Sequence, residues 1–214
     1  MKRFSIQSRL YQIAAALLAT ILLATLISAV WAKYVREVSF SDNVRFTANL
    51  ARNFELFEHQ AVRDENTGAY SLDLTKEVDA NSYTLIPGLD VPKDPTIRIT
   101  DKSAVDAFLY IEVTNALDGV TYAMSSDWLA LNIPGKTVYV YKGDTAAPMI
   151  IDEAFGTGEI KLIAADKFVV TDLIKNKAVG QTIAFRAYLL QIANETALTV
   201  DAAETVFKTS LGIA

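Results

Sequence analysis

The chain has 214 residues, contains no cysteine and carries a formal net charge of −5 at pH 7. Without cysteine it can hold neither disulfides nor iron–sulfur clusters nor cysteine zinc sites, and thiolate catalysis is excluded. The acidic balance argues against nucleic acid as a partner and against charge-driven adhesion to anionic lipid. The sequence contains no phosphate-cradling glycine loop and no calcium-loop pattern, so we expect no cofactor.

The N-terminus has the three parts of a secretory signal. Its basic flank consists of three residues: Lys2, Arg3 and Arg9. An uncharged apolar run follows at residues 13–30, and Val30 and Ala32 supply slim side chains at the positions that a signal peptidase reads. We therefore predict a signal peptide over residues 1–32, cleaved between Ala32 and Lys33. A run of this length is also just long enough to span a bilayer, so an uncleaved anchor is the alternative.

Cleavage would leave 214 − 32 = 182 residues outside the cytoplasm, enough for one sizeable domain. The exported part then has 20 − 3 = 17 basic and 25 acidic residues, a net charge of −8. We expect a secreted protein of the extracellular matrix or cell surface, whose membrane contact is confined to its N-terminal segment. Residues 33–48 are interpreted as a separate N-terminal segment and residues 49–214 as one domain.

A period of two begins after the leader and continues to about residue 56. Apolar side chains occupy even positions of this stretch: Val38, Phe40, Val44, Phe46, Leu50, Phe54 and Leu56. Alternation of this length predicts a half-buried strand. Asp42 and Arg52 interrupt the apolar face, so we expect two strands with a bend between them. The polar residues 63–68 are predicted to form a loop.

Short strands separated by turn formers account for most of the remaining chain. The predicted strands are 82–86, 96–100, 107–114, 128–132, 137–142, 159–163, 168–171 and 181–193. A helical pattern occurs at residues 200–209, between Thr199 as a cap and Gly212, and a second short helix is considered at residues 171–177. Many short strands with one or two short helices predict an all-β fold, a jelly-roll-like antiparallel β-sandwich.

Four local patterns follow one another along the chain. They are Trp31-Ala32 with the alternating segment behind it, residues 85–95 (LIPGLDVPKDP), residues 103–113 (SAVDAFLYIEV) and residues 185–191 (FRAYLLQ) before the last helix. In this order they resemble the TasA/camelysin family, exported β-sandwich proteins of bacterial biofilm matrix, and the related archaeal bundling pilins. The resemblance implies a biofilm fibre subunit. It also identifies the family's turn motif as Pro87, Gly88, Lys93, Asp94 and Pro95.

The stretch 87–95 can be interpreted without the family. Pro87-Gly88 predicts a turn. Pro92 and Pro95 have no backbone N–H, so this connection cannot lie in the interior of a sheet. A structural corner is the expected role, and a binding loop is the alternative.

Residues suited to catalysis are sparse. His59 is the sole histidine, and a zinc peptidase motif needs two histidines one helical turn apart. We expect His59 to be exposed at a strand end, and carboxylates such as Asp94 to be solvated in loops. The chain is therefore predicted not to be an enzyme, and a camelysin-type metallopeptidase is the least favoured function.

The leading hypothesis is a structural subunit of extracellular fibres. After removal of the signal peptide, residues 33–48 would leave their own domain and add as a strand to the next subunit's sheet. Four donor residues would fill apolar pockets there: Val38, Phe40, Val44 and Phe46. The partners are then other copies of the chain, the signal peptidase and accessory matrix proteins. The alternative is a monomeric β-sandwich that residues 13–30 anchor to the membrane as an adhesion or binding module.

Overall fold

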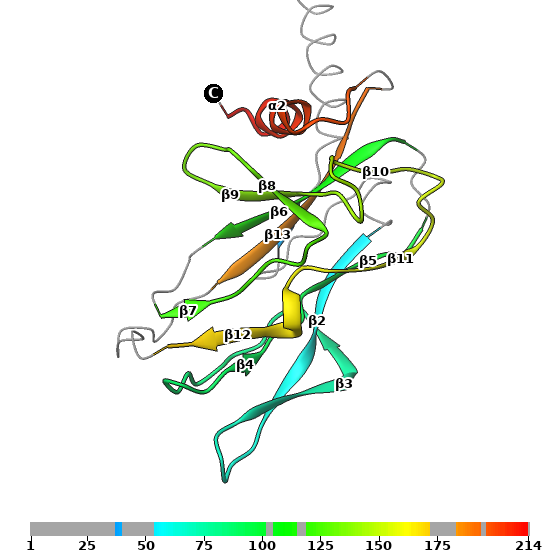
Figure 1. The fold of residues 1–214 in the computed structure, drawn as a ribbon. Coiled ribbons are helices and arrows are strands. Elements are labelled where there is room, and N and C mark those ends of the chain that lie inside the picture. Colours follow the sequence, from blue (N-terminus) through cyan, green and yellow to red (C-terminus); the bar gives the residue numbers. More distant parts are fainter. Residues whose placement is uncertain are drawn as a thin grey trace, which may run out of the picture. The chain divides into compact units, whose positions relative to one another are not determined.

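The computed structural model describes residues 37–39, 54–101, 105–114, 119–171, 183–193 and 196–213. The chain divides into two units, Met1–Val35 and Arg36–Ala214, and every described residue belongs to the second. Most of the described elements are strands of antiparallel sheets, and one α-helix follows them near the C-terminus (Figure 1). The expected all-β class is confirmed. The predicted signal segment, residues 1–32, lies outside the described residues.

Three sheets hold the described strands, and every described pairing is antiparallel. The order in the largest sheet is β1 (Glu37–Ser39), β13 (Ala184–Gln191), β6 (Ala107–Thr114), β9 (Thr137–Tyr141) and β8 (Trp128–Leu131), and β10 (Ile150–Ile151) also pairs with β6. The second sheet has the order β11 (Gly158–Lys161), β5 (Thr96–Ile99), β2 (Phe54–Arg63) and β3 (Tyr70–Val78). The third has the order β4 (Val91–Pro92), β12 (Lys167–Val170) and β7 (Val120–Thr121).

The hydrophobic core joins residues of all three sheets in one buried cluster. β6 and β13 form its centre, because they pair over eight residues each, from Ala184 opposite Thr114 to Gln191 opposite Ala107. Successive side chains of a strand point to opposite faces. The odd-numbered residues of these two strands, apart from Gln191 at the end of β13, accordingly belong to the core cluster. The cluster also contains Ile97 of β5 and Phe168 of β12.

The opposite face of β6 and β13 packs against helix α2 (Val200–Leu211). Thr199 caps the helix by accepting a hydrogen bond from the N–H of Ala202, and Gly212 ends it at a φ of +64°. The ring of Phe207 contacts Tyr110 of β6 and Tyr188 of β13. The helix predicted at residues 200–209 is therefore confirmed, and burial on two faces explains why β6 is apolar along almost its whole length.

Most predicted strands are confirmed with small changes at their ends. The prediction at residues 82–86 was wrong, because this stretch is irregular: the N–H of Thr84 donates to the hydroxyl of Tyr70 instead of a strand partner. β3 was missed, since both of its faces are largely exposed. β2 continues to Arg63, well beyond the expected end of the alternation. A short 3-10 turn, η2 (Ala164–Asp166), precedes β12. The helix considered at residues 171–177 lies almost wholly outside the described residues.

Candidate functional site

The N-terminal segment contributes a strand to the largest sheet. β1 pairs with β13 in a register that sets Glu37 opposite Tyr188, Val38 opposite Ala187 and Ser39 opposite Arg186. β1 ends the sheet, since its one described neighbour is β13. Of the predicted donor residues, Val38 therefore lies in a strand. The other predicted donor and cleavage residues lie outside the described residues: Ala32, Lys33, Phe40, Val44 and Phe46.

The strand that β1 covers is among the most buried of the described chain. Six of the eight residues of β13 are buried. Phe185, Ala187 and Leu189 belong to the core cluster, so a small side chain stands between two large ones on that face. On the other face, Tyr188 lies under helix α2. The edge that β1 protects therefore belongs to the centre of the hydrophobic structure.

A buried carboxylate lies on the helix-facing side of this sheet. Glu112 of β6 accepts a hydrogen bond from Lys136 Nζ at 2.5 Å on Oε1 and one from the Tyr188 hydroxyl at 2.6 Å on Oε2. Burial alone would raise the pKa of Glu112. The two hydrogen bonds, with the charges of Lys136 and Arg186, outweigh burial and hold the pKa below its ordinary value. Both oxygens of this glutamate are thus satisfied, and it ties β6, β13 and the start of β9 together.

The predicted turn at Pro87-Gly88 is present. The N–H of Leu89 donates to the carbonyl of Ile86 at 3.0 Å, and Gly88 has a φ of +78°, which favours glycine at the third position of such a turn. The N–H of Gly88 also donates to the carbonyl of Val170, at the end of β12. Pro92 lies in β4, which is the edge strand of the third sheet, as the lack of a backbone donor requires. The corner role of this connection is consistent with these contacts.

The Lys-Asp-Pro part of the motif reaches β2 in a way the sequence analysis did not predict. Lys93 and Glu58 of β2 form an ion pair, and the side chain of Glu58 is 0% exposed. The approach of the two groups lacks hydrogen-bond geometry, so neither oxygen of Glu58 has a hydrogen-bond partner among the described residues. The ring of Tyr83 lies 5.8 Å from Lys93 Nζ, and the Tyr83 hydroxyl donates to the carbonyl of Pro92. Burial, with the nearby charge of Glu58, strongly raises the pKa of Tyr83.

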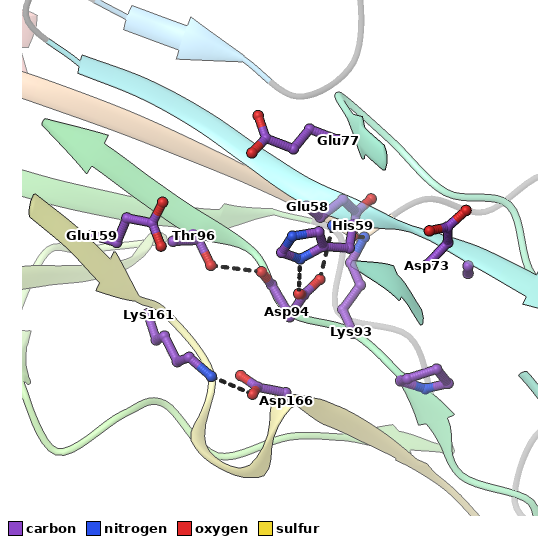
Figure 2. A network of polar contacts seen from close by, with 12 residues as sticks. Glu58, His59, Asp73, Glu77, Lys93, Asp94, Thr96, Glu159, Lys161 and Asp166 are labelled. Carbon is purple, nitrogen blue, oxygen red and sulfur yellow. Dashed lines mark hydrogen bonds and ion pairs between the residues drawn. The ribbon is translucent and has the colours of Figure 1, made fainter. Parts of the chain in front are cut away.

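Asp94 binds the next residue of β2, as Figure 2 shows. Its Oδ2 lies 2.5 Å from His59 Nδ1, and its Oδ1 accepts the backbone N–H of His59 at 3.0 Å. The expectations for both residues were therefore wrong. His59 lies inside β2 with a side chain that is 21% exposed, and Asp94 is buried instead of solvated. The physical reason is that alternation in β2 sends Glu58 and His59 to opposite faces, where the adjacent Lys93 and Asp94 meet them.

The contact between His59 and Asp94 falls at an irregularity of the sheet. The register between β2 and β3 shifts between His59 and Gln60, and a shift of this kind leaves backbone groups without ladder partners. Asn81 binds two backbone groups of β2 next to this shift: its Oδ1 accepts the N–H of Ala61 at 2.7 Å, and its Nδ2 donates to the carbonyl of His59 at 2.8 Å. Side chains of Asp94 and Asn81 therefore pair with backbone groups of β2 beyond the last residue that pairs with β5.

Carboxylates of the second sheet converge on one guanidinium. Arg98 of β5 donates to Glu77 of β3 at 2.5 and 3.0 Å and to Glu159 of β11 at 3.0 Å, and it lies 3.4 Å from Glu55 of β2. Its guanidinium carbon lies 4.1 Å from the centre of the Phe57 ring. The hydrogen bonds that Arg98 donates to Glu77 and Glu159 raise the pKa of Arg98, and Arg98 in turn lowers the pKa of Glu77. These acidic groups are thus engaged in ion pairs across the sheet.

Glu58, Asp94 and Glu112 each form an ion pair or a hydrogen bond with another part of the domain. In the part of the chain that the structure describes, no group of three or more histidine or acidic side chains could hold a metal ion. None of the helices in that part is long and apolar enough to cross a membrane.

Comparisons with known proteins returned no relative. No protein-family model, no curated protein and no solved structure matches the chain. The fold class therefore rests on the described sheets, and the candidate site on the β1–β13 pairing and on the contacts of the turn motif.

The sequence-based predictions missed the buried Glu58 and Glu112, as well as Asn81, Tyr83 and Arg98. Glu112 interrupts an apolar stretch of β6 between Ile111 and Val113, and Glu58 directly follows Leu56-Phe57 in β2. A carboxylate in such a position is a signal that can be used, because it must find a cationic or hydrogen-bonding partner if the strand is buried.

Proposed function

We propose that the chain is an exported structural subunit that polymerises into extracellular fibres of a biofilm matrix. Its N-terminal segment, residues 33–48, adds as a strand to the sheet of the next subunit after the signal peptide has been removed. The domain that receives it is a jelly-roll-like β-sandwich of the kind found in the TasA/camelysin family, which the chain resembles. In this proposal the protein acts by assembly and carries out no catalysis.

One observation carries the proposal: part of this segment already takes the position of an edge strand. β1 is only three residues long and completes its sheet through pairing with β13. Backbone hydrogen bonds between strands do not depend on which copy supplies the strand. The same segment of a second copy can therefore make the same bonds. Because such a contact is head-to-tail and does not close on itself, repeating it produces a filament.

Deleting residues 33–40 from the mature protein tests the proposal. We expect the deletion to abolish the fibres seen by electron microscopy, because it removes the whole of β1. A matched control removes residues 33–36, which precede β1, and should still form fibres. Fibres of normal appearance from the variant that lacks residues 33–40 would contradict the proposal.

The mass of the exported protein separates the fibre subunit from the anchored module. Intact-mass spectrometry of the secreted protein should give a chain that begins at Lys33. A chain that keeps residues 1–32 on the cell would instead support a monomeric module held in the membrane by residues 13–30. The metallopeptidase alternative would regain support only from casein cleavage that a chelator abolishes.

A further inference from the structure

Two adjacent residues of β2 bind two adjacent residues of the connection between β4 and β5 (Figure 2). Glu58 contacts Lys93, and Asp94 accepts hydrogen bonds from the backbone N–H and the ring of His59. The backbone of Lys93 is fixed as well, because its N–H donates to the carbonyl of Asp166 at 2.8 Å. The contact between Glu58 and Lys93 is therefore held in place by bonds that neighbouring groups make.

Water has little access to this contact. The side chain of Glu58 is 0% exposed and that of Lys93 is 11% exposed, and the ring of Tyr83 lies 5.8 Å from the amine. Neither oxygen of Glu58 has a hydrogen-bond partner among the described residues. Charges that are removed from water are costly unless hydrogen bonds satisfy them. Transfer of one proton from the ammonium to the carboxylate removes both charges at once, and it leaves a neutral amine beside a neutral carboxylic acid.

We propose that Lys93 and Glu58 become joined by an isopeptide bond in the folded protein, with their ion pair as the state before reaction. Nζ of Lys93 attacks the side-chain carboxyl carbon of Glu58, so that a C–N bond forms and one C–O bond breaks. The departing hydroxyl takes up a proton from the nitrogen and leaves as water. Acid and amine thus give amide and water, and the step needs neither an oxidant nor a reductant.

The fixed contact supplies the driving force for this reaction. Free amines and carboxylic acids do not condense readily in water, but groups held in contact reach effective concentrations of about 10⁵–10⁸ M. The product joins β2 to the connection between β4 and β5, across 93 − 58 = 35 positions of the sequence. It gives a chain without cysteine a crosslink that reducing agents do not break. The inference is independent of whether the protein forms fibres.

A second glutamate and lysine provide a comparison within the same domain. Glu112 has a hydrogen bond on each oxygen, from Lys136 and from the Tyr188 hydroxyl. Because its pKa lies below the ordinary value, its carboxylate stays ionised at neutral pH and resists attack by an amine. The side chain of Lys136 is 34% exposed, so water solvates its ammonium group. We therefore expect the bond at Lys93 and none at Lys136.

The mass of the intact, unsubstituted protein tests the proposal. After folding, purification and denaturation, the chain should be lighter by one water molecule than the mass calculated from its sequence and measured N-terminus. Trypsin cannot cut after a modified lysine, so the digest should contain residues 53–63 linked to residues 77–98. Tandem mass spectrometry should locate the link at Glu58 and Lys93, and Glu112 and Lys136 should be recovered in unlinked peptides.

Lys93→Arg is the matched variant, because it keeps a positive charge but lacks the amine that forms the bond. Its mass should equal the calculated one, and residues 53–63 should be recovered as a free peptide. A parent protein of full calculated mass would overturn the proposal. So would a loss of water that persists in Lys93→Arg, because the water would then come from another site. A link between Glu112 and Lys136 would contradict the argument from burial and missing hydrogen bonds.

Discussion

Two buried glutamates show how differently the same side chain can be accommodated. Glu112, in β6, has a hydrogen bond on each oxygen, from Lys136 and from Tyr188. Glu58, in β2, has a single ion pair with Lys93 and no hydrogen bond among the described residues. Both carboxylates are almost fully buried.

The difference lies in what surrounds each pair. Tyr188 reaches Glu112 from the neighbouring strand β13, where the register fixes the distance. The partly exposed Lys136 reaches it from the residue just before β9. Lys93 reaches Glu58 from an irregular connection that three prolines constrain. A buried charge that depends on one partner is costly to leave alone, whereas one that several groups satisfy tolerates the loss of a partner better. The two sites should therefore respond differently to the same substitutions.

The largest effect is expected from Lys93→Met, which leaves the charge of Glu58 buried without a partner. Loss of one member of a buried ion pair costs about 3–5 kcal/mol of unfolding free energy, which urea unfolding of the mature protein can measure. The double variant Glu58→Leu with Lys93→Met is the control, because it removes both charges and should recover most of this loss. A single variant as stable as the parent would show that the Glu58 ion pair does not bear on stability.

Tyr188→Phe should have the next largest effect, because it removes a donor to the charged Glu112. Hydrogen bonds to charged groups contribute about 1.5–3 kcal/mol. Tyr110→Phe is a matched control in the neighbouring strand, since the Tyr110 hydroxyl donates to the neutral carbonyl of Ala203. It should cost about 0.5–1.5 kcal/mol. Equal losses in the two variants would mean that the charge of Glu112 adds nothing to its hydrogen bond with Tyr188.

Lys136→Met is the counterpart of Lys93→Met at Glu112, the glutamate that has a hydrogen bond on each oxygen. Its side chain is 34% exposed, and water screens the pair. We expect a loss of about 1 kcal/mol, the upper end for exposed ion pairs, again by urea unfolding. A loss as large as that of Lys93→Met would contradict the view that the Tyr188 hydroxyl and water support Glu112 after Lys136 is removed.

The smallest expected effect is a change in the unfolding free energy with pH. Because the pKa of Glu112 is lower in the folded protein than its ordinary value, the folded state binds fewer protons than the unfolded state between these two values. The stabilisation by ionised Glu112 is therefore present at neutral pH and is lost as the pH falls through this interval. Unfolding free energies of the parent and of Glu112→Gln, measured over an acid series, should converge as the pH is lowered. A difference that stays constant would rule out this linkage.

The sequence was sufficient to predict the central strands of the fold but not the whole of the peripheral strands β2 and β3. The strands at 107–114 and 184–191 stand out because both of their faces are buried and their residues are apolar almost without interruption. β3 was missed although Tyr70, Leu72 and Leu74 alternate with polar residues in it, because this alternation is short and both of its faces are largely exposed. The end of β2 was missed because Glu58 and His59 look like surface residues.

The candidate site was predictable only where its contacts join residues that are close in the sequence. Pro87-Gly88 specifies its own turn through the fixed φ of proline and the positive φ of glycine. The partners of Lys93 and Asp94 lie 35 residues earlier in the chain, and only the course of β2 beside β4 and β5 brings them together. Glu58 and His59 are adjacent, and so are their partners Lys93 and Asp94. Such a matched pair of dipeptides becomes visible once both stretches are known to be extended.

The pairing of β1 with β13 also has a consequence for the order of folding. It joins the two ends of the sequence, and helix α2, which covers the outer face of β13, is made later still. A pairing over so long a separation carries a large entropic cost of loop closure and waits for the intervening chain. Among the described strands, β1 is therefore synthesised first and its partner β13 last. In the proposed fibre, this delay would leave the backbone of β1 available to another copy whose β13 is already in place.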